Sequence, residues 1–286
     1  MKNYDFAFSL GYSCGASQAL RDAGLQFASF PLDWIGSPSL MASANTIATH
    51  FDKWLLADDL ELFDVRHDTG FLTRVYRNRR TGFGFSHEFS DFKNFDENYK
   101  AVSATYERRI KRLEDVLKGA SNILVLYLEL PFRACIGVDE MNAALAMLSK
   151  SYPGKTFELL YAYEDPTCKE PRETRLSPNI STLALDYRLF DRGEITHFVN
   201  VRKLTEYLRD NIKVADYRTK DDIEQFKKFT SGNVKKRWGA ASRLQAFKNK
   251  WAFKLFRHFE KYLKNRGIIH REGPLWFVED AKGAAR

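Results

Sequence analysis

Cys14 stands in a stretch whose residue types could make its thiol reactive. The sequence around it is FSLGYSCGASQAL, residues 8–20, with Gly11 and Gly15 on either side of the cysteine. An apolar run precedes it and a helix-like run follows, so the pattern predicts a thiol at a strand-to-helix turn. A helix N-terminus lowers the pKa of a thiol and can hold an oxyanion, and the two glycines let a substrate approach the backbone. The alternative is a thiol that only packs, because free cysteine is often buried.

A cysteine nucleophile needs a general base, and two of the six histidines are suitably placed for this role. His87 ends the strand-like segment GFGFSHEF, and His197 stands just before the last helix that we expect in the domain. The residues themselves leave both open. The other histidines fall at a helix end, in a polar stretch that we expect to be an exposed loop, or in the C-terminal segment: His50, His67, His258 and His270.

Other polar side chains could serve the same site. Asp33 lies between apolar neighbours in FPLDW, where a carboxylate must find a partner because its desolvation is costly. It could orient a catalytic histidine, or it could tie a loop or cap a helix. Trp34, Arg108 and Arg109 are candidates for substrate contact. For the two arginines the alternative is a solvated or ion-paired helix face.

The elements that must position these residues alternate between strands and helices. We expect strands at residues 4–10, 123–130, 157–163 and 181–187, a β-hairpin at 71–89, and helices at 15–23, 40–50, 97–118, 138–151 and 201–211. Strand–helix alternation is typical of a mainly parallel sheet with helices on both faces. The sequence therefore predicts a three-layer α/β domain over residues 1–215, with functional residues where strands end and helices begin.

The remaining residues, 216–286, are predicted to form a basic helical extension. The chain has a net charge of +8, but residues 235–266 contain eleven Lys or Arg and one acid. Apolar side chains recur at helical spacing between the basic ones, which is typical of a helix that lies on an anionic membrane surface. The stripe could equally pack on the domain, and we disfavour nucleic acid because no nucleic-acid module accompanies it. The candidate membrane contacts are Trp238, Lys250, Trp251, Lys254, Leu255 and Arg257.

Several classes of protein are disfavoured. Three cysteines make no disulfide framework, so we expect a reducing compartment such as the cytoplasm. The N-terminal sequence MKNYDFAFSL is not typical of a signal peptide, and the apolar run ILVLYLELPF is too short to span a membrane. No zinc spacing, phosphate-binding loop or dinucleotide fingerprint is found, so we expect no metal and no cofactor.

Five motifs together resemble a known family. In chain order they are SLGYSC, FPLDW, FSHEF, YERRIKRLEDVL and ILVLYLE, and they cover about residues 4–165. The combination resembles a bacterial family of unknown function described as "putative papain-like cysteine peptidase". The resemblance implies Cys14 as the nucleophile, His87 as the base and Asp33 or a neighbour as the orienting acid.

The chain departs from this family pattern at two positions, and its predicted fold departs from the family's label. Leu32 stands where phenylalanine is usual and Glu88 where aspartate is usual. Papain-type enzymes pair a helical subdomain with an antiparallel one, whereas this sequence predicts a parallel α/β sheet. That order of elements is more similar to SGNH-type esterases and acyltransferases, whose nucleophile is serine, and this similarity favours His197 over His87.

Three functions follow as hypotheses. The first is a hydrolase that forms an acyl-thioester at Cys14 with a peptide, ester or glycoconjugate substrate. The second is an acyltransferase of surface polysaccharide assembly at the inner membrane face. The third is a binding module in which Cys14 has no catalytic role.

Overall fold

The structure is a computed structural model of the chain. It describes residues 1–217, apart from 13, 37, 69–70, 91–93, 130–134, 187, 192–193 and 200, together with 269–272 and 275–278. The chain divides into two compact units, Met1–Arg218 and Thr219–Arg286. In the second unit the described residues form one antiparallel hairpin of β14 (Ile269–Glu272) and β15 (Leu275–Val278).

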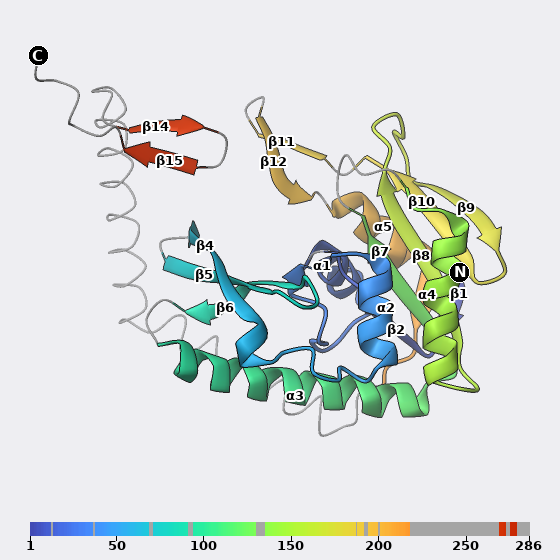
Figure 1. The fold of residues 1–286 in the computed structure, drawn as a ribbon. Coiled ribbons are helices and arrows are strands. Elements are labelled where there is room, and N and C mark those ends of the chain that lie inside the picture. The colour runs from blue at the N-terminus through green and yellow to red at the C-terminus, as the bar shows by residue number, and fades with distance from the viewer. Residues whose placement is uncertain are drawn as a thin grey trace, which may run out of the picture. The chain divides into compact units, whose positions relative to one another are not determined.

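A five-stranded sheet forms the centre of the first unit (Figure 1). Its order is β2-β7-β8-β10-β9, and every pair is parallel except β10 with β9 at the edge. The strands are β2 (Phe6–Ser9), β7 (Asn122–Leu128), β8 (Thr156–Glu164), β9 (Arg172–Ser177) and β10 (Ile180–Leu185). Beside this sheet, β1 (Lys2–Tyr4) pairs in parallel with β13 (Ile212–Val214).

Helices cover both faces of the sheet because its strands are apolar on both sides (Figure 1). One face packs against α1 (Cys14–Asp22) and α5 (Arg202–Asn211). The opposite face packs against α2 (Leu40–Ala48), α3 (Phe95–Gly119) and α4 (Val138–Ser151). Alternate residues of β7 divide between the two cores, since Ile123 and Val125 belong to one and Leu124 and Leu126 to the other. The prediction of a three-layer α/β fold with a mainly parallel sheet is confirmed.

A second, antiparallel sheet lies on the α3 side, in the order β3-β6-β5-β4. Its strands are β3 (Ile35–Gly36), β4 (Leu60–Asp68), β5 (Phe71–Asn78) and β6 (Gly84–Ser90), and the 3-10 helix η1 (Ala57–Asp59) precedes β4. The register between β5 and β6 is irregular: Arg74 pairs with Phe89 and Tyr76 with Phe85. Three residues of β6 therefore face one residue of β5, and this bulge contains His87 and Glu88. Bulges of this kind redirect side chains and are common next to functional sites.

Aromatic packing fixes this second sheet to α3. The ring of Tyr106 lies 5.1 Å from that of Trp54 and 5.8 Å from that of Phe85, both nearly edge to face. Phe89 stacks on Phe95, the first residue of α3. Such pairs stabilise a core beyond their buried area.

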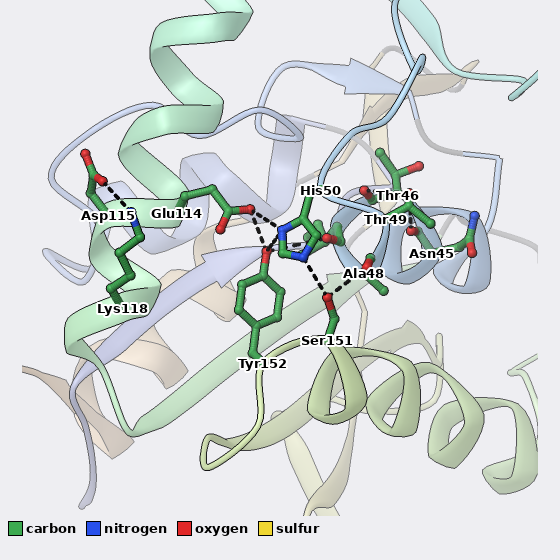
Figure 2. A network of polar contacts seen from close by, with 11 residues as sticks. Asn45, Thr46, Ala48, Thr49, His50, Glu114, Asp115, Lys118, Ser151 and Tyr152 are labelled. Atoms are coloured by element: carbon green, nitrogen blue, oxygen red, sulfur yellow. Dashed lines mark hydrogen bonds and ion pairs between the residues drawn. The ribbon is translucent and has the colours of Figure 1, made fainter.

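A polar network ties the ends of three helices together (Figure 2). His50, just after α2, contacts Glu114 of α3 through Nδ1 at 3.0 Å and Ser151 of α4 through Nε2 at 3.1 Å. The hydroxyl of Tyr152 also donates to Glu114, at 2.7 Å. The C-terminal part of α3 is therefore linked to the ends of α2 and α4.

The helices expected from the sequence are present within one or two residues of their predicted ends, and so is the 71–89 hairpin. The expectation of an exposed loop around His67 is wrong, because this residue lies in β4, paired with Leu72. His197 lies in β12 (Glu194–Val199), which pairs with β11 (Arg188–Asp191). The predicted helical extension after residue 215 lies outside the described residues.

Candidate functional site

Cys14 is the first residue of α1 and follows β2 after a short turn. Gly11, with φ of 94°, makes this turn in a conformation that other residues rarely adopt. The turn is anchored to the sheet, because the N–H of Leu128 in β7 donates to the Gly11 carbonyl at 3.2 Å and the Gly11 N–H donates to Ser9 Oγ at 2.9 Å. The thiol therefore lies at the carboxyl edge of the parallel strands, where α/β proteins bind ligands.

The thiol of Cys14 is half-buried and neutral at rest. Burial raises the pKa of this thiol, and the charge of Glu88 raises it further. A hydrogen bond from the backbone N–H of Cys14 itself lowers the pKa, but by less than burial raises it. Burial thus outweighs the effect expected from the helix N-terminus. A proton must leave the sulfur before or during any attack, so this thiol needs a base.

Glu88 contacts α3 and acts on the Cys14 thiol through its charge. Its carboxylate accepts a hydrogen bond from the Tyr106 hydroxyl at 2.9 Å, while its charge acts on Cys14. Burial and this carboxylate raise the pKa of Tyr106 well above its usual value, so the phenol remains a neutral donor. The guanidinium of Arg109 lies against the same ring, 5.1 Å from its centre.

A cavity of about 370 Å³ opens beside this cluster, and we call it the Arg109 cavity. Its described lining consists of Trp34, Glu88, Ala101, Val102, Thr105 and Arg109. Three elements contribute to it: the FPLDW loop, β6 and α3. A cavity of this size can hold a small molecule or one residue of a polymer.

Asp33 is fully buried and positions the helix that carries Cys14. Its carboxylate accepts hydrogen bonds from Ser17 Oγ at 2.9 Å, from the Phe30 N–H at 2.7 Å and from Gln26 Nε2 at 2.5 Å. Arg21 pairs with it at 3.7 Å. Burial raises the pKa of Asp33 to about 6 against these contacts. Ser17 lies one turn after Cys14 in α1, so these are the loop-tying contacts that the sequence offered as one alternative.

The other predicted substrate contacts divide between the cavity and its surroundings. Trp34 and Arg109 line the cavity, and Gly15 follows the thiol in α1. The ring of Trp34 is covered by the guanidinium of Arg21 at 4.9 Å. Arg108 is exposed and donates to Thr105 of its own helix at 3.1 Å.

Both candidate bases remain predictions. The side chains of His87 and His197 lie outside the described part of the structure, and so do the candidate membrane contacts at residues 238–257. Among the described residues, no cluster of three or more His, Cys, Asp or Glu could hold a metal ion. No helix in that part of the chain is long and apolar enough to cross a membrane.

The remaining cysteines lie in different surroundings. Cys168 is buried and its thiol donates to Asp165 at 3.3 Å. Cys135 is exposed as a residue, but its sulfur is partly shielded from water. This partial burial, followed by the charge of Glu129, raises the pKa of the thiol. Of the three cysteines, only Cys14 is the first residue of a helix.

Glu88 and Tyr106 are the site residues that sequence reasoning did not single out. Glu88 was visible only as a departure from the family pattern, and Tyr106 as one member of the apolar stripe of the helix. Neither signal indicates a polar pair, because the contact depends on how α3 crosses β6.

The fold and this turn define an α/β protein with a cysteine at the carboxyl edge of a parallel sheet. The chain belongs to the family described as "Putative papain-like cysteine peptidase", whose model matches residues 5–152. That range runs from β2 to the end of α4 and includes Cys14, Asp33, Glu88 and Arg109. No curated protein and no solved structure matches the chain.

Proposed function

We propose that the protein is a hydrolase that forms an acyl-thioester at Cys14. The observation that carries the proposal is the position of this thiol at the first turn of α1, within the electrostatic reach of Glu88, which lines the Arg109 cavity. The chain also belongs to the family described as "Putative papain-like cysteine peptidase". A half-buried sulfur at that place lies next to the free N–H groups of the first helical turn, which can hold an oxyanion.

In the proposed reaction a histidine removes the proton of Cys14 as the sulfur attacks an acyl carbonyl. The S–C bond forms, the N–H groups of the first turn of α1 hold the oxyanion, and the leaving group departs with the proton. Water then attacks the thioester while the histidine takes a proton from the water; the C–S bond breaks, the acid is released, and the histidine returns the proton to the sulfur. Glu88 favours an imidazolium over a free thiolate nearby, because its charge stabilises a cation and destabilises the anion.

Acylation with p-nitrophenyl acetate, followed by mass mapping, tests the nucleophile. We expect an acetyl group on Cys14 that hydroxylamine removes, and loss of p-nitrophenol turnover in Cys14→Ala. Cys135→Ser serves as the matched control, because this thiol is exposed and is not at a helix N-terminus. If Cys14→Ala retains turnover, or Cys135 takes up the label as fast as Cys14, the proposal fails.

His87→Gln and His197→Gln separate the two candidate bases. Loss of a general base lowers the acylation rate about 10²- to 10⁴-fold. We expect this loss for one of the two variants and little change for the other. Unchanged acylation in both would contradict a histidine base.

Acyl transfer is the second outcome of the same intermediate. The thioester can pass its acyl group to water or to a hydroxyl or amine acceptor. When the acyl-enzyme is mixed with a hydroxyl or amine acceptor, a transferase loads the acceptor in preference to water, whereas a hydrolase releases free acid.

We further propose that the basic segment, residues 235–266, binds an anionic membrane surface. Its charge of eleven Lys or Arg against one acid supports this, since each basic residue near such a surface contributes about 1 kcal/mol. The full chain should cosediment with phosphatidylserine vesicles and not with phosphatidylcholine vesicles. Deletion of residues 231–286 should release it, and equal binding without them would overturn this proposal.

A further inference from the structure

Arg109 carries a hydrogen-bond donor that the described residues do not use. Its Nη1 atom is buried, and no acceptor within the described part of the structure reaches it. The guanidinium is fixed by the Tyr106 ring beneath it. A charged donor removed from water is costly unless an acceptor satisfies it. Because the Arg109 side chain lines the cavity, it would gain from turning this shielded donor toward a ligand acceptor there.

The walls of the Arg109 cavity suit a ligand with an apolar body. Trp34, Ala101 and Val102 contribute aromatic and aliphatic surface, and Thr105 adds a side chain with one hydroxyl. The Arg21 guanidinium covers the Trp34 ring and keeps it in place. An apolar group against these walls would leave its anionic end at Arg109.

The charges of the lining favour a monoanion over a dianion. Glu88 and Arg109 are the only ionisable side chains in the described lining, and their charges cancel. A carboxylate therefore leaves one net negative charge in the site, whereas a phosphate monoester adds nearly two close to Glu88. A guanidinium binds a carboxylate through two parallel N–H donors.

We propose that the Arg109 cavity binds the free carboxylate of an amino acid residue, as at the C-terminal end of a peptide, and holds it beside Cys14. The inference deepens the proposed function and rests on it for the reaction, but binding itself needs no thiol chemistry. The substrate class is then a peptide or acylated amino acid with a free carboxylate close to the bond that is cleaved.

The experiment uses the full chain with Cys14→Ala, which binds without turnover. N-acetyl-phenylalanine, its neutral amide and phenyl phosphate are titrated by calorimetry. We expect the carboxylate to bind about 10-fold or more tightly than the amide, and the phosphate to bind less tightly than the carboxylate. Equal affinity for acid and amide, or tighter binding of the phosphate, would overturn the inference.

Two variants in the cavity and one control variant outside it assign the binding to this cavity. Arg109→Gln should weaken the binding of the carboxylate about 10- to 100-fold and leave the affinity for the amide unchanged. Lys111→Gln, which removes the same charge from an exposed position of the same helix, should change neither. Ala101→Phe adds a ring at an exposed position of the lining and should block both ligands, so it decides the matter if Arg109→Gln does not fold. Retained binding in Ala101→Phe would contradict the assignment.

The two proposals fail separately. If the carboxylate binds in a way that depends on Arg109 but Cys14 is not acylated in the natural chain, the hydrolase proposal is wrong and the carboxylate site stands. If Cys14 is acylated but no such binding is found, the carboxylate site is wrong and the hydrolase proposal stands.

Discussion

The Tyr106 hydroxyl donates to the Glu88 carboxylate at 2.9 Å, and this pair fixes a negative charge that acts on Cys14, the first residue of α1. The contact joins the middle of α3 to the bulge of β6. It keeps the Glu88 carboxylate in one place, so its effect on the Cys14 thiol is a fixed property of the fold.

Glu88→Gln should make Cys14 more reactive at neutral pH. Removal of the carboxylate removes a charge that raises the pKa of the thiol, so a larger fraction is thiolate. Iodoacetamide should alkylate Cys14 severalfold faster at pH 7, and the pH profile of the rate should move to lower pH. Cys168 in the same protein is the internal reference. A slower reaction at Cys14 would contradict the electrostatic role of Glu88.

Asp33 should make stability depend on pH in a direction unusual for a carboxylate. Its folded-state pKa of about 6 lies above the ordinary value of 3.8, so the folded state binds the proton more tightly. Its contribution is full below pH 3.8 and is lost as the pH rises through about 6, by on the order of 3 kcal/mol. The free energy of unfolding is measured with urea for the natural chain and for Asp33→Asn between pH 4 and 7. The natural chain should lose about this amount relative to Asp33→Asn as the pH rises. A difference that does not change with pH would show that burial does not raise this pKa.

The network of Figure 2 should couple Tyr152 and Glu114 energetically. The 2.7 Å hydrogen bond between them is half-buried, and His50 shares the same carboxylate oxygen. We expect Tyr152→Phe to lower the free energy of unfolding by about 1 kcal/mol. In a double-mutant cycle with Glu114→Gln the two losses should not add. Additive losses would mean that the contact contributes nothing.

Asn78 should be essential for the turn between β5 and β6. It is fully buried, its Nδ2 donates to the Trp54 carbonyl at 2.9 Å, and its Oδ1 accepts from the N–H groups of Arg80 and Thr81. Asn78→Ala removes one buried and two half-buried hydrogen bonds and should cost about 2–3 kcal/mol. The exposed Asn211→Ala should cost less than about 0.5 kcal/mol. Similar thermal unfolding of the two variants would contradict this role.

The sequence predicted the parallel sheet well because its signals are local. The apolar run of β7 and the regular apolar spacing of α3 each depend on one segment alone. Cys14 at the start of a helix follows in the same way, from the residues next to it. The same locality explains why the 71–89 hairpin was predicted as a pair.

The remaining features depend on contacts between distant segments. β4 was missed because its strand runs into VRHDTG, a polar stretch that pattern alone assigns to a loop. It is a strand because β5 pairs with it, with a register shift between Leu62 and Asp64. The Glu88–Tyr106 contact and the cavity likewise need the crossing of α3 over β6, which no periodicity encodes.

One feature of the topology bears on how the chain reaches its native state. β2 precedes Cys14 directly, and its partner in the sheet is β7, with Phe6 opposite Ile123. Pairing over such a sequence separation is entropically costly and slow. β2 therefore cannot pair with β7 until more than half of the first unit has been synthesised. Until then Phe6 and Phe8, both buried in the finished sheet, lack the cover that β7 provides. The N-terminal strand is thus the segment whose exposure during synthesis would favour aggregation and chaperone binding.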